Sequence, residues 1–86
     1  MTGGRRVVTL LTRQGCPMCD VAADELAGLL PGFPVEYQVI DVDEAAGDKP
    51  ELRAEYGDRL PVILLDGAEH SYWEVDAERL RADLNG

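Results

Sequence analysis

Residues 7–19 have the sequence VVTLLTRQGCPMC, in which an apolar, β-branched run is followed closely by two cysteines with two residues between them. The run over residues 7–12 is apolar at nearly every position, which is typical of a strand that is buried on both faces. After Pro17 the apolar period changes to that of a helix, whose stripe consists of Met18, Ala22, Leu26 and Leu29. Pro17 suits the first turn of this helix, because an N–H group there would have no partner within the helix. The two cysteines therefore lie where a buried strand passes into a helix.

The rest of the chain alternates between strand and helix patterns. The predicted elements are a strand over residues 35–42, a short helix between Lys49-Pro50 and Gly57, strands over residues 61–65 and 69–73, and a last helix that starts at Asp76. A βαβ unit makes the first two strands parallel, and a tight Asp66-Gly67 turn makes the last two antiparallel. The order βαβαββα predicts an α/β protein with the thioredoxin-like fold, a four-stranded mixed sheet flanked by three helices. Residues 1–86 are expected to form a single domain of this kind.

Composition excludes several classes of partner. The formal net charge is −9, with 17 acidic against 8 basic residues, which argues against nucleic acid and against an anionic membrane surface. No apolar run approaches the roughly 20 residues of a membrane-spanning helix. The apolar run over residues 7–11 is also too short for the core of a signal peptide. We therefore expect a cytoplasmic, monomeric protein, in which a lone cysteine pair is more often catalytic or metal-binding than structural.

The cysteine pair has the spacing of a redox-active dithiol. Cys16 lies at the predicted helix N-terminus, where unpaired N–H groups and the helix dipole stabilise a thiolate and lower the pKa of a cysteine below its free value of about 8.5. Cys16 is therefore expected to attack a substrate disulfide, and Cys19, nearly one helical turn further on, to resolve the mixed disulfide. The alternatives are two buried structural cysteines or half of a zinc site. A closed zinc site needs about four ligands, and the chain adds only His70 to its cysteines, so a single chain is expected to hold no metal.

Pro61 is the second informative residue. A proline at the start of a strand is ordinary, because the first position tolerates a missing N–H. In a Cys-x-x-Cys domain with this order of elements, we instead expect a cis Leu60–Pro61 bond across from Cys16. Such a bond would turn the backbone of Leu60 toward an extended thiol substrate.

The chain resembles glutaredoxins, and more closely the small bacterial glutaredoxin-like domains, from Val7 through Leu84. The residues that carry the resemblance are Gly15-Cys16-Pro17-Met18-Cys19 and Leu60-Pro61-Val62. The resemblance implies that Arg13 meets one carboxylate of glutathione and that the backbone of Leu60 pairs with its cysteinyl part. It also implies that the N-terminus of the last helix, at Val75-Asp76, receives the other carboxylate. The substrate-binding residues expected on this basis are Arg13, Pro17, Leu60, Pro61 and Asp76.

The chain also departs from the family pattern. Met18 replaces the usual Tyr, and Trp73-Glu74 replaces a Gly-Gly pair, which puts the Glu74 carboxylate near an anion site. Glutathione and another low-molecular-weight thiol therefore both stay open as the co-substrate, and no tightly bound cofactor is expected. The substrate would be a disulfide-containing protein or a small thiol, and the electron donor a reductase or a low-molecular-weight thiol.

Three functions are compatible with these residues. The first is a thiol–disulfide oxidoreductase, with Cys16 as nucleophile and Cys19 as the resolving thiol. The others are a non-catalytic binding module of thioredoxin fold and a dimeric iron–sulfur or metal carrier that uses Cys16. His70 is expected to be an exposed strand residue, and Tyr72 and Trp73 to belong to the core or a sheet face.

Overall fold

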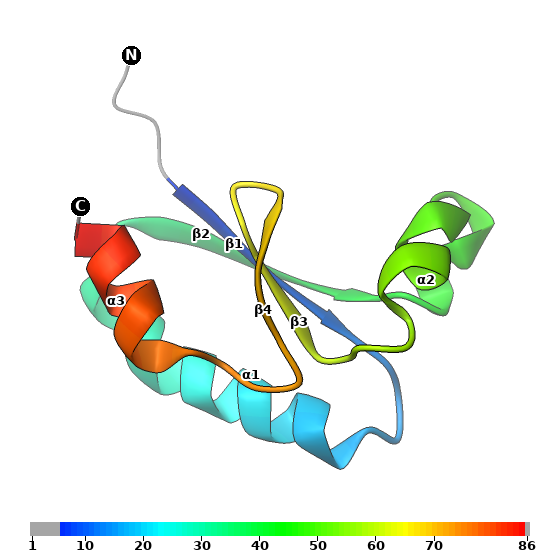
Figure 1. Ribbon diagram of the computed structural model, residues 1–86, viewed down its shortest axis with the longest axis horizontal. Coiled ribbons are helices and arrows are strands. Elements are labelled where there is room, and N and C mark those ends of the chain that lie inside the picture. The colour runs from blue at the N-terminus through cyan, green and yellow to red at the C-terminus, as the bar shows by residue number, and fades with distance from the viewer. Residues whose placement is uncertain (1–5, 86) are drawn as a thin grey trace.

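A computed structural model of the protein describes residues 6–85, so the outermost residues of the predicted 1–86 domain lie outside the described part (Figure 1). Its strands are β1 (Arg6–Thr12), β2 (Val35–Asp41), β3 (Val62–Leu65) and β4 (Ala68–Tyr72). Its α-helices are α1 (Pro17–Leu29), α2 (Pro50–Tyr56) and α3 (Ala77–Asn85), and two 3-10 turns are η1 (Leu30–Gly32) and η2 (Glu44–Gly47). The predicted βαβαββα order is confirmed. No helix in the described part is long and apolar enough to cross a membrane.

The four strands form one mixed sheet in the order β2-β1-β3-β4. β1 runs parallel to β2 and antiparallel to β3, and β3 pairs antiparallel with β4. The β3–β4 turn has positive φ at both central residues, 54° at Asp66 and 86° at Gly67, as the tightest hairpin turns require. The register places the end of β1 and the start of β3 together, because Leu11 pairs with Val62. The loop that carries the cysteines and the segment that carries Pro61 therefore lie at the same end of the sheet.

The two faces of the sheet are covered by different helices (Figure 1). α1 and α3 cover one face, where the larger apolar cluster consists of Val8, Leu10, Ala22, Leu26, Leu29, Leu30, Ile63, Leu65, Val75 and Leu80. α2 covers the other face, where Leu52 and Tyr56 pack against Leu11, Val42, Val62 and Leu64. Successive residues of β1 and β3 thus serve opposite cores, which explains why both strands are apolar at nearly every position.

The apolar stripe of α1 differs from the prediction at its first member. Met18 is 52% exposed, whereas Cys19 is 1% exposed and joins Ala22, Leu26 and Leu29 on the buried face. The helical period explains the difference, because two turns span about seven residues and place Cys19, not Met18, in line with Leu26. One consequence is that the middle of the cysteine motif presents an apolar side chain to solvent.

The end of the sheet away from the cysteines is held by hydrogen bonds between the start of β1, the β3–β4 turn and α3. Asp66 accepts hydrogen bonds from the Val7 N–H, at 2.8 Å, and from the Arg6 guanidinium, which also donates to the Asp83 carbonyl at 3.2 Å. The Val7 N–H, followed by the Arg6 side chain, lowers the pKa of the Asp66 carboxyl. The start of β1, the β3–β4 turn and the last turns of α3 are therefore joined at one corner.

Candidate redox site

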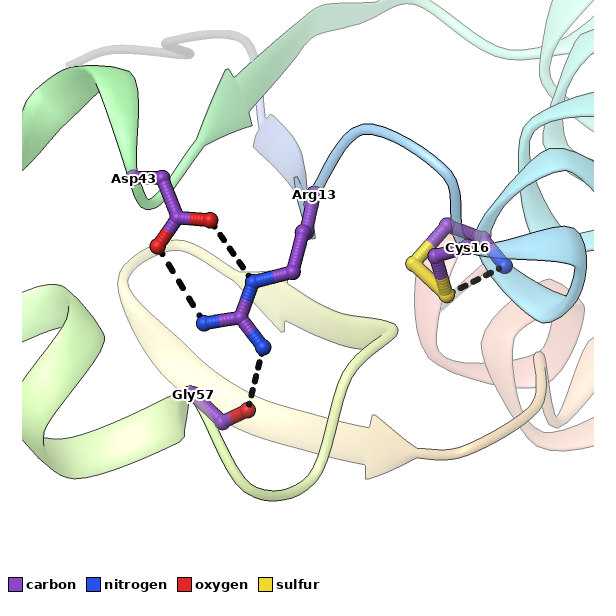
Figure 2. Close-up of a disulfide and its surroundings, with 5 residues drawn as sticks. Arg13, Cys16, Asp43 and Gly57 are labelled. Carbon is purple, nitrogen blue, oxygen red and sulfur yellow. Dashed lines mark hydrogen bonds and ion pairs between the residues drawn. A yellow bond between two sulfur atoms is a disulfide. The ribbon is translucent and has the colours of Figure 1, made fainter.

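The cysteine pair forms a disulfide, with Cα atoms 5.2 Å apart, at the start of α1 (Figure 2). Gly15, at φ 75°, makes the turn that leads the chain into the helix. Cys16 is the N-cap residue, and its carbonyl accepts from the N–H groups of Cys19, at 3.1 Å, and Asp20, at 3.2 Å. The Cys16 sulfur also accepts from the Cys19 N–H at 3.2 Å. The sulfur of Cys16 thus occupies a place where backbone N–H groups stabilise negative charge.

The two sulfurs differ in access to solvent. Cys16 is partly exposed, whereas Cys19 is buried on the face of α1 that packs against the sheet. An incoming disulfide can therefore approach Cys16 but not Cys19. The two cysteines of the motif are thus unequal in their access to a reactant.

The Leu60–Pro61 peptide bond is cis, as predicted. Pro61 is fully buried, and Leu60 is partly buried against the α2 side of the sheet. The Pro61 carbonyl accepts from the Trp73 N–H at 2.7 Å. The start of β3 is thereby tied to the segment that joins β4 to α3.

Arg13 points away from the cysteines and toward Asp43 and Gly57 (Figure 2). Its guanidinium donates to both carboxylate oxygens of Asp43, at 2.8 and 3.2 Å, and to the Gly57 carbonyl at 3.4 Å. The hydrogen bond with Arg13 lowers the pKa of the Asp43 carboxyl, and Asp43 in turn raises the pKa of Arg13. The carboxylate partner of Arg13 is thus supplied by this chain, so a carboxylate of glutathione would have to displace Asp43.

This ion pair makes the stability of the fold dependent on pH. Because the pKa of Asp43 is lowered in the folded chain, the ion pair stabilises the fold above the unfolded pKa of aspartate, about 4, and this stabilisation is lost as the pH falls through the lower folded value. We expect Asp43→Asn to lower the urea midpoint most near neutral pH and progressively less below about pH 4. Arg13→Gln should show the same pH dependence, and the double variant should add nothing to it. A difference from wild type that stays constant with pH would contradict this coupling.

Asp76 caps α3 as predicted. Its carboxylate accepts from the Arg79 N–H at 3.2 Å, and Val75 and Leu80 are buried together as the predicted staple. The neighbouring Glu74 is exposed. A carboxylate of the chain itself therefore binds the N-terminus of α3, just as the Asp43 carboxylate binds Arg13. Both positions at which the resemblance placed glutathione carboxylates already have an acidic partner.

The prediction that His70 is an exposed strand residue is wrong. Ile63 pairs with Ser71 and Leu64 with Glu69, so His70 is the extra residue of a β-bulge in β4. The bulge turns the side chain of His70 toward α3, where its Nε2 lies 2.8 Å from a carboxylate oxygen of Asp83 and the Arg79 guanidinium donates to its carbonyl. The His70 side chain is only 5% exposed. It holds α3 against β4 rather than facing solvent.

The prediction that Tyr72 and Trp73 are core or sheet-face residues holds for Tyr72, which lies on an exposed face of β4 opposite Val62, and is wrong for Trp73, which follows the strand. Tyr72 is 45% and Trp73 54% exposed, and their rings meet edge to face with centroids 5.0 Å apart. Trp73 has φ 70°, a left-handed conformation that costs a non-glycine residue roughly 1–2 kcal/mol. The hydrogen bond of its N–H to Pro61 helps to hold that conformation, which turns the chain between β4 and α3 and leaves the indole outside the core.

The model of one protein family, described as Glutaredoxin-like domain (DUF836), matches residues 7–85. This chain belongs to that glutaredoxin-like family. Among its relatives are uncharacterized proteins of Mycobacterium bovis and Mycobacterium tuberculosis, each 58% identical over 81 residues that cover 93% of this chain and 84% of the relative.

Solved structures bear out the fold of this glutaredoxin-like protein. The protein Ne2328 from Nitrosomonas europaea superposes with a TM-score of 0.77 at 24% identity, over 98% of this chain and 96% of that one. The protein XcR50 from X. campestris superposes with a TM-score of 0.66 at 33% identity, over 91% of this chain and 95% of that one. The thioredoxin of Fasciola hepatica superposes with a TM-score of 0.60 at 28% identity, over 95% of this chain and 80% of that one. The thioredoxin-like fold is confirmed, and it places two cysteines at disulfide distance, an arrangement compatible with redox activity.

Proposed function

We propose that this protein is a thiol–disulfide oxidoreductase in which Cys16 is the nucleophile and Cys19 the resolving thiol. The observation that carries the proposal is the difference between the two sulfurs. Cys16 is partly exposed and its sulfur accepts a helix N-terminal N–H, whereas Cys19 is buried. A thiolate is the attacking species in disulfide exchange, and a helix N-terminus favours it.

The reaction proceeds in two exchanges. The Cys16 thiolate attacks one sulfur of a substrate disulfide, forms a mixed disulfide and releases the other substrate sulfur as a thiolate. The Cys19 thiolate then attacks the Cys16 sulfur, which releases the second substrate thiolate and forms the Cys16–Cys19 disulfide. The substrate gains two electrons and the protein loses two. A dithiol reductant or a disulfide reductase must then reduce the protein for a further cycle, and no bound cofactor takes part.

The acidic surroundings favour a substrate other than glutathione. Asp43 forms an ion pair with the guanidinium of Arg13, and Asp76 accepts an N–H at the N-terminus of α3. Glu74 and the net charge of −9 add repulsion toward a ligand with two carboxylates. We therefore propose a disulfide within a polypeptide as the substrate and the disulfide of a low-molecular-weight thiol as a poor one.

The order of thiol reactivity tests the assignment of roles. We expect a substoichiometric amount of iodoacetamide, added to the reduced protein near neutral pH, to alkylate Cys16 before Cys19, because only Cys16 combines access with N–H stabilisation. Fragmentation of the peptide that contains both cysteines, in the mass spectrometer, shows which of the two carries the label. Preferential alkylation of Cys19 would reverse the roles, and equal alkylation would remove the basis for them.

A further inference from the structure

A small cleft lies beside the cysteine motif, between α1 and the segment that leads into α3. It is lined by Met18, Val21, Ala22, Glu25, Trp73 and Glu74 and has a volume of about 160 Å³. A cavity of roughly 150 Å³ is large enough to hold a benzene ring. The cleft is therefore the right size for one apolar side chain of a bound molecule.

Exposed apolar side chains gather around this cleft. The described residues include six large apolar side chains that are exposed, and four of them belong to the cleft or adjoin it through Trp73, namely Met18, Val21, Tyr72 and Trp73. Apolar groups that cluster on a surface are typical of interaction sites, whereas apolar groups scattered singly need no explanation. This cluster adjoins Cys16 through Met18, which lies within the cysteine motif.

The backbone at Trp73 indicates that its side chain is needed at the surface. Its φ of 70° is one that glycine adopts freely and a bulky residue adopts at a cost. The indole adds no core packing to offset that cost, because more than half of it is exposed. Strain of this kind is found where the side chain that bears it serves a binding or catalytic site.

The charge beside the cleft narrows the choice of occupant. Glu25 and Glu74 line it, and neither forms an ion pair with any residue in the described part of the chain. A second copy of this protein would bring the same carboxylates and the same net charge of −9. A positively charged residue next to an apolar one complements the cleft better than either a second copy or an anionic small thiol.

Building on the proposed redox function, we infer that this cleft selects polypeptide disulfides that carry an apolar side chain next to a lysine or arginine, close to the cysteine that is attacked. Val21 follows Cys16 by five residues, or about 7.5 Å along a helix axis. An extended substrate rises about 3.3 Å per residue, so the apolar side chain should lie two to three residues from the substrate cysteine. The cleft then acts before the first exchange, by holding the substrate disulfide at Cys16.

Four peptide disulfides test this inference against a small uncharged one, hydroxyethyl disulfide. The peptides are identical except for Leu or Ser two residues from the cysteine, and Lys or Glu beside that position. Reduced wild-type protein should react with the Leu-Lys peptide about tenfold or more faster than with the Ser-Glu peptide. In Trp73→Gly the preference for Leu over Ser, measured with Lys beside both, should fall to about one. The thermal midpoint should stay at or above that of wild type, because glycine relieves the left-handed backbone. The ratio is internal to each variant, so a general loss of activity does not affect it.

Three further variants sharpen the result. Val21→Ser changes the α1 side of the cleft and should lower the preference for the Leu peptides over the Ser peptides. This variant keeps the test available if Trp73→Gly does not fold. Glu74→Gln should lower the preference for Lys over Glu and leave the preference for Leu over Ser unchanged. Tyr37→Ser, which removes an exposed aromatic ring from the far edge strand, should retain both.

The outcomes separate this inference from the function on which it rests. If hydroxyethyl disulfide is reduced but the four peptides react at equal rates, the cleft is not a selecting site and the redox function stands. A preference for Leu over Ser that survives in both Trp73→Gly and Val21→Ser would equally overturn the inference. If no disulfide is reduced at all, the proposed function itself is wrong.

Discussion

Cys16→Ser should reduce the rate of disulfide reduction to that of buffer alone. A serine hydroxyl is not ionised near neutral pH and cannot form a mixed disulfide, so the first exchange has no nucleophile. The measurement is a single turnover, in which reduced protein freed of reductant is mixed with a peptide disulfide and the released thiol is counted. Val39→Ser, at an exposed position of β2, should leave this reaction unchanged. Substantial thiol release by the Cys16→Ser protein would show that Cys16 is not the nucleophile.

Cys19→Ser should fail at the second step instead. The Cys16 thiolate still attacks, but without a resolving thiol the mixed disulfide persists. One substrate thiol should therefore be released per protein rather than two, and the mass of the protein should increase by that of the retained half of the substrate. Release of both thiols by this variant would mean that Cys19 does not resolve the intermediate.

Leu26→Ala should cause a large loss of stability. Leu26 is fully buried and packs in the apolar cluster between α1, α3 and the sheet. Truncation of a leucine at such a site costs about 2–5 kcal/mol, which in a domain of this size lowers the thermal midpoint by roughly 8 °C or more. Calorimetry or thermal unfolding followed by circular dichroism measures this shift.

Leu26→Met is the matched control for that prediction. It keeps the volume of the side chain, so it should cost less than about 1.5 kcal/mol. Similar losses in both variants would mean that the packing at this position is not the cause. A negligible loss in Leu26→Ala would mean that the core closes around the missing atoms.

The fold was predictable because its signals are local. The apolar run of β1, the changed period at Pro17 and the Asp66-Gly67 turn each identify an element or a connection within a few residues. The cysteine motif and Pro61 were equally evident, since spacing and position identify both. The predicted stripe of α1 is wrong at Met18, because two successive steps of four residues exceed two helical turns and drift away from the face that Cys19 shares with Leu26.

The surroundings of the site were not predictable in the same way, because they depend on pairs of residues far apart in the sequence. Arg13 and Asp43 are 30 residues apart, and the loop that contains Asp43 has the composition of an ordinary solvated loop. The burial of His70 depends on a bulge in the pairing of β3 with β4, which leaves no mark in the composition of β4. Trp73 is exposed where its backbone adopts a positive φ, and no residue next to it in the sequence indicates that conformation.

The corner where Arg6 joins Asp66 and Asp83 has a practical consequence for handling the protein. It lies at the start of β1, whereas Cys16 follows the opposite end of that seven-residue strand, which spans about 23 Å. A fusion partner or a solid support could be attached beyond Arg6 or beyond α3. It would then lie at the end of the sheet opposite the cysteines, which would stay exposed to solution. Oriented immobilisation of this kind would leave every molecule on a sensor surface or electrode open to the disulfides in solution.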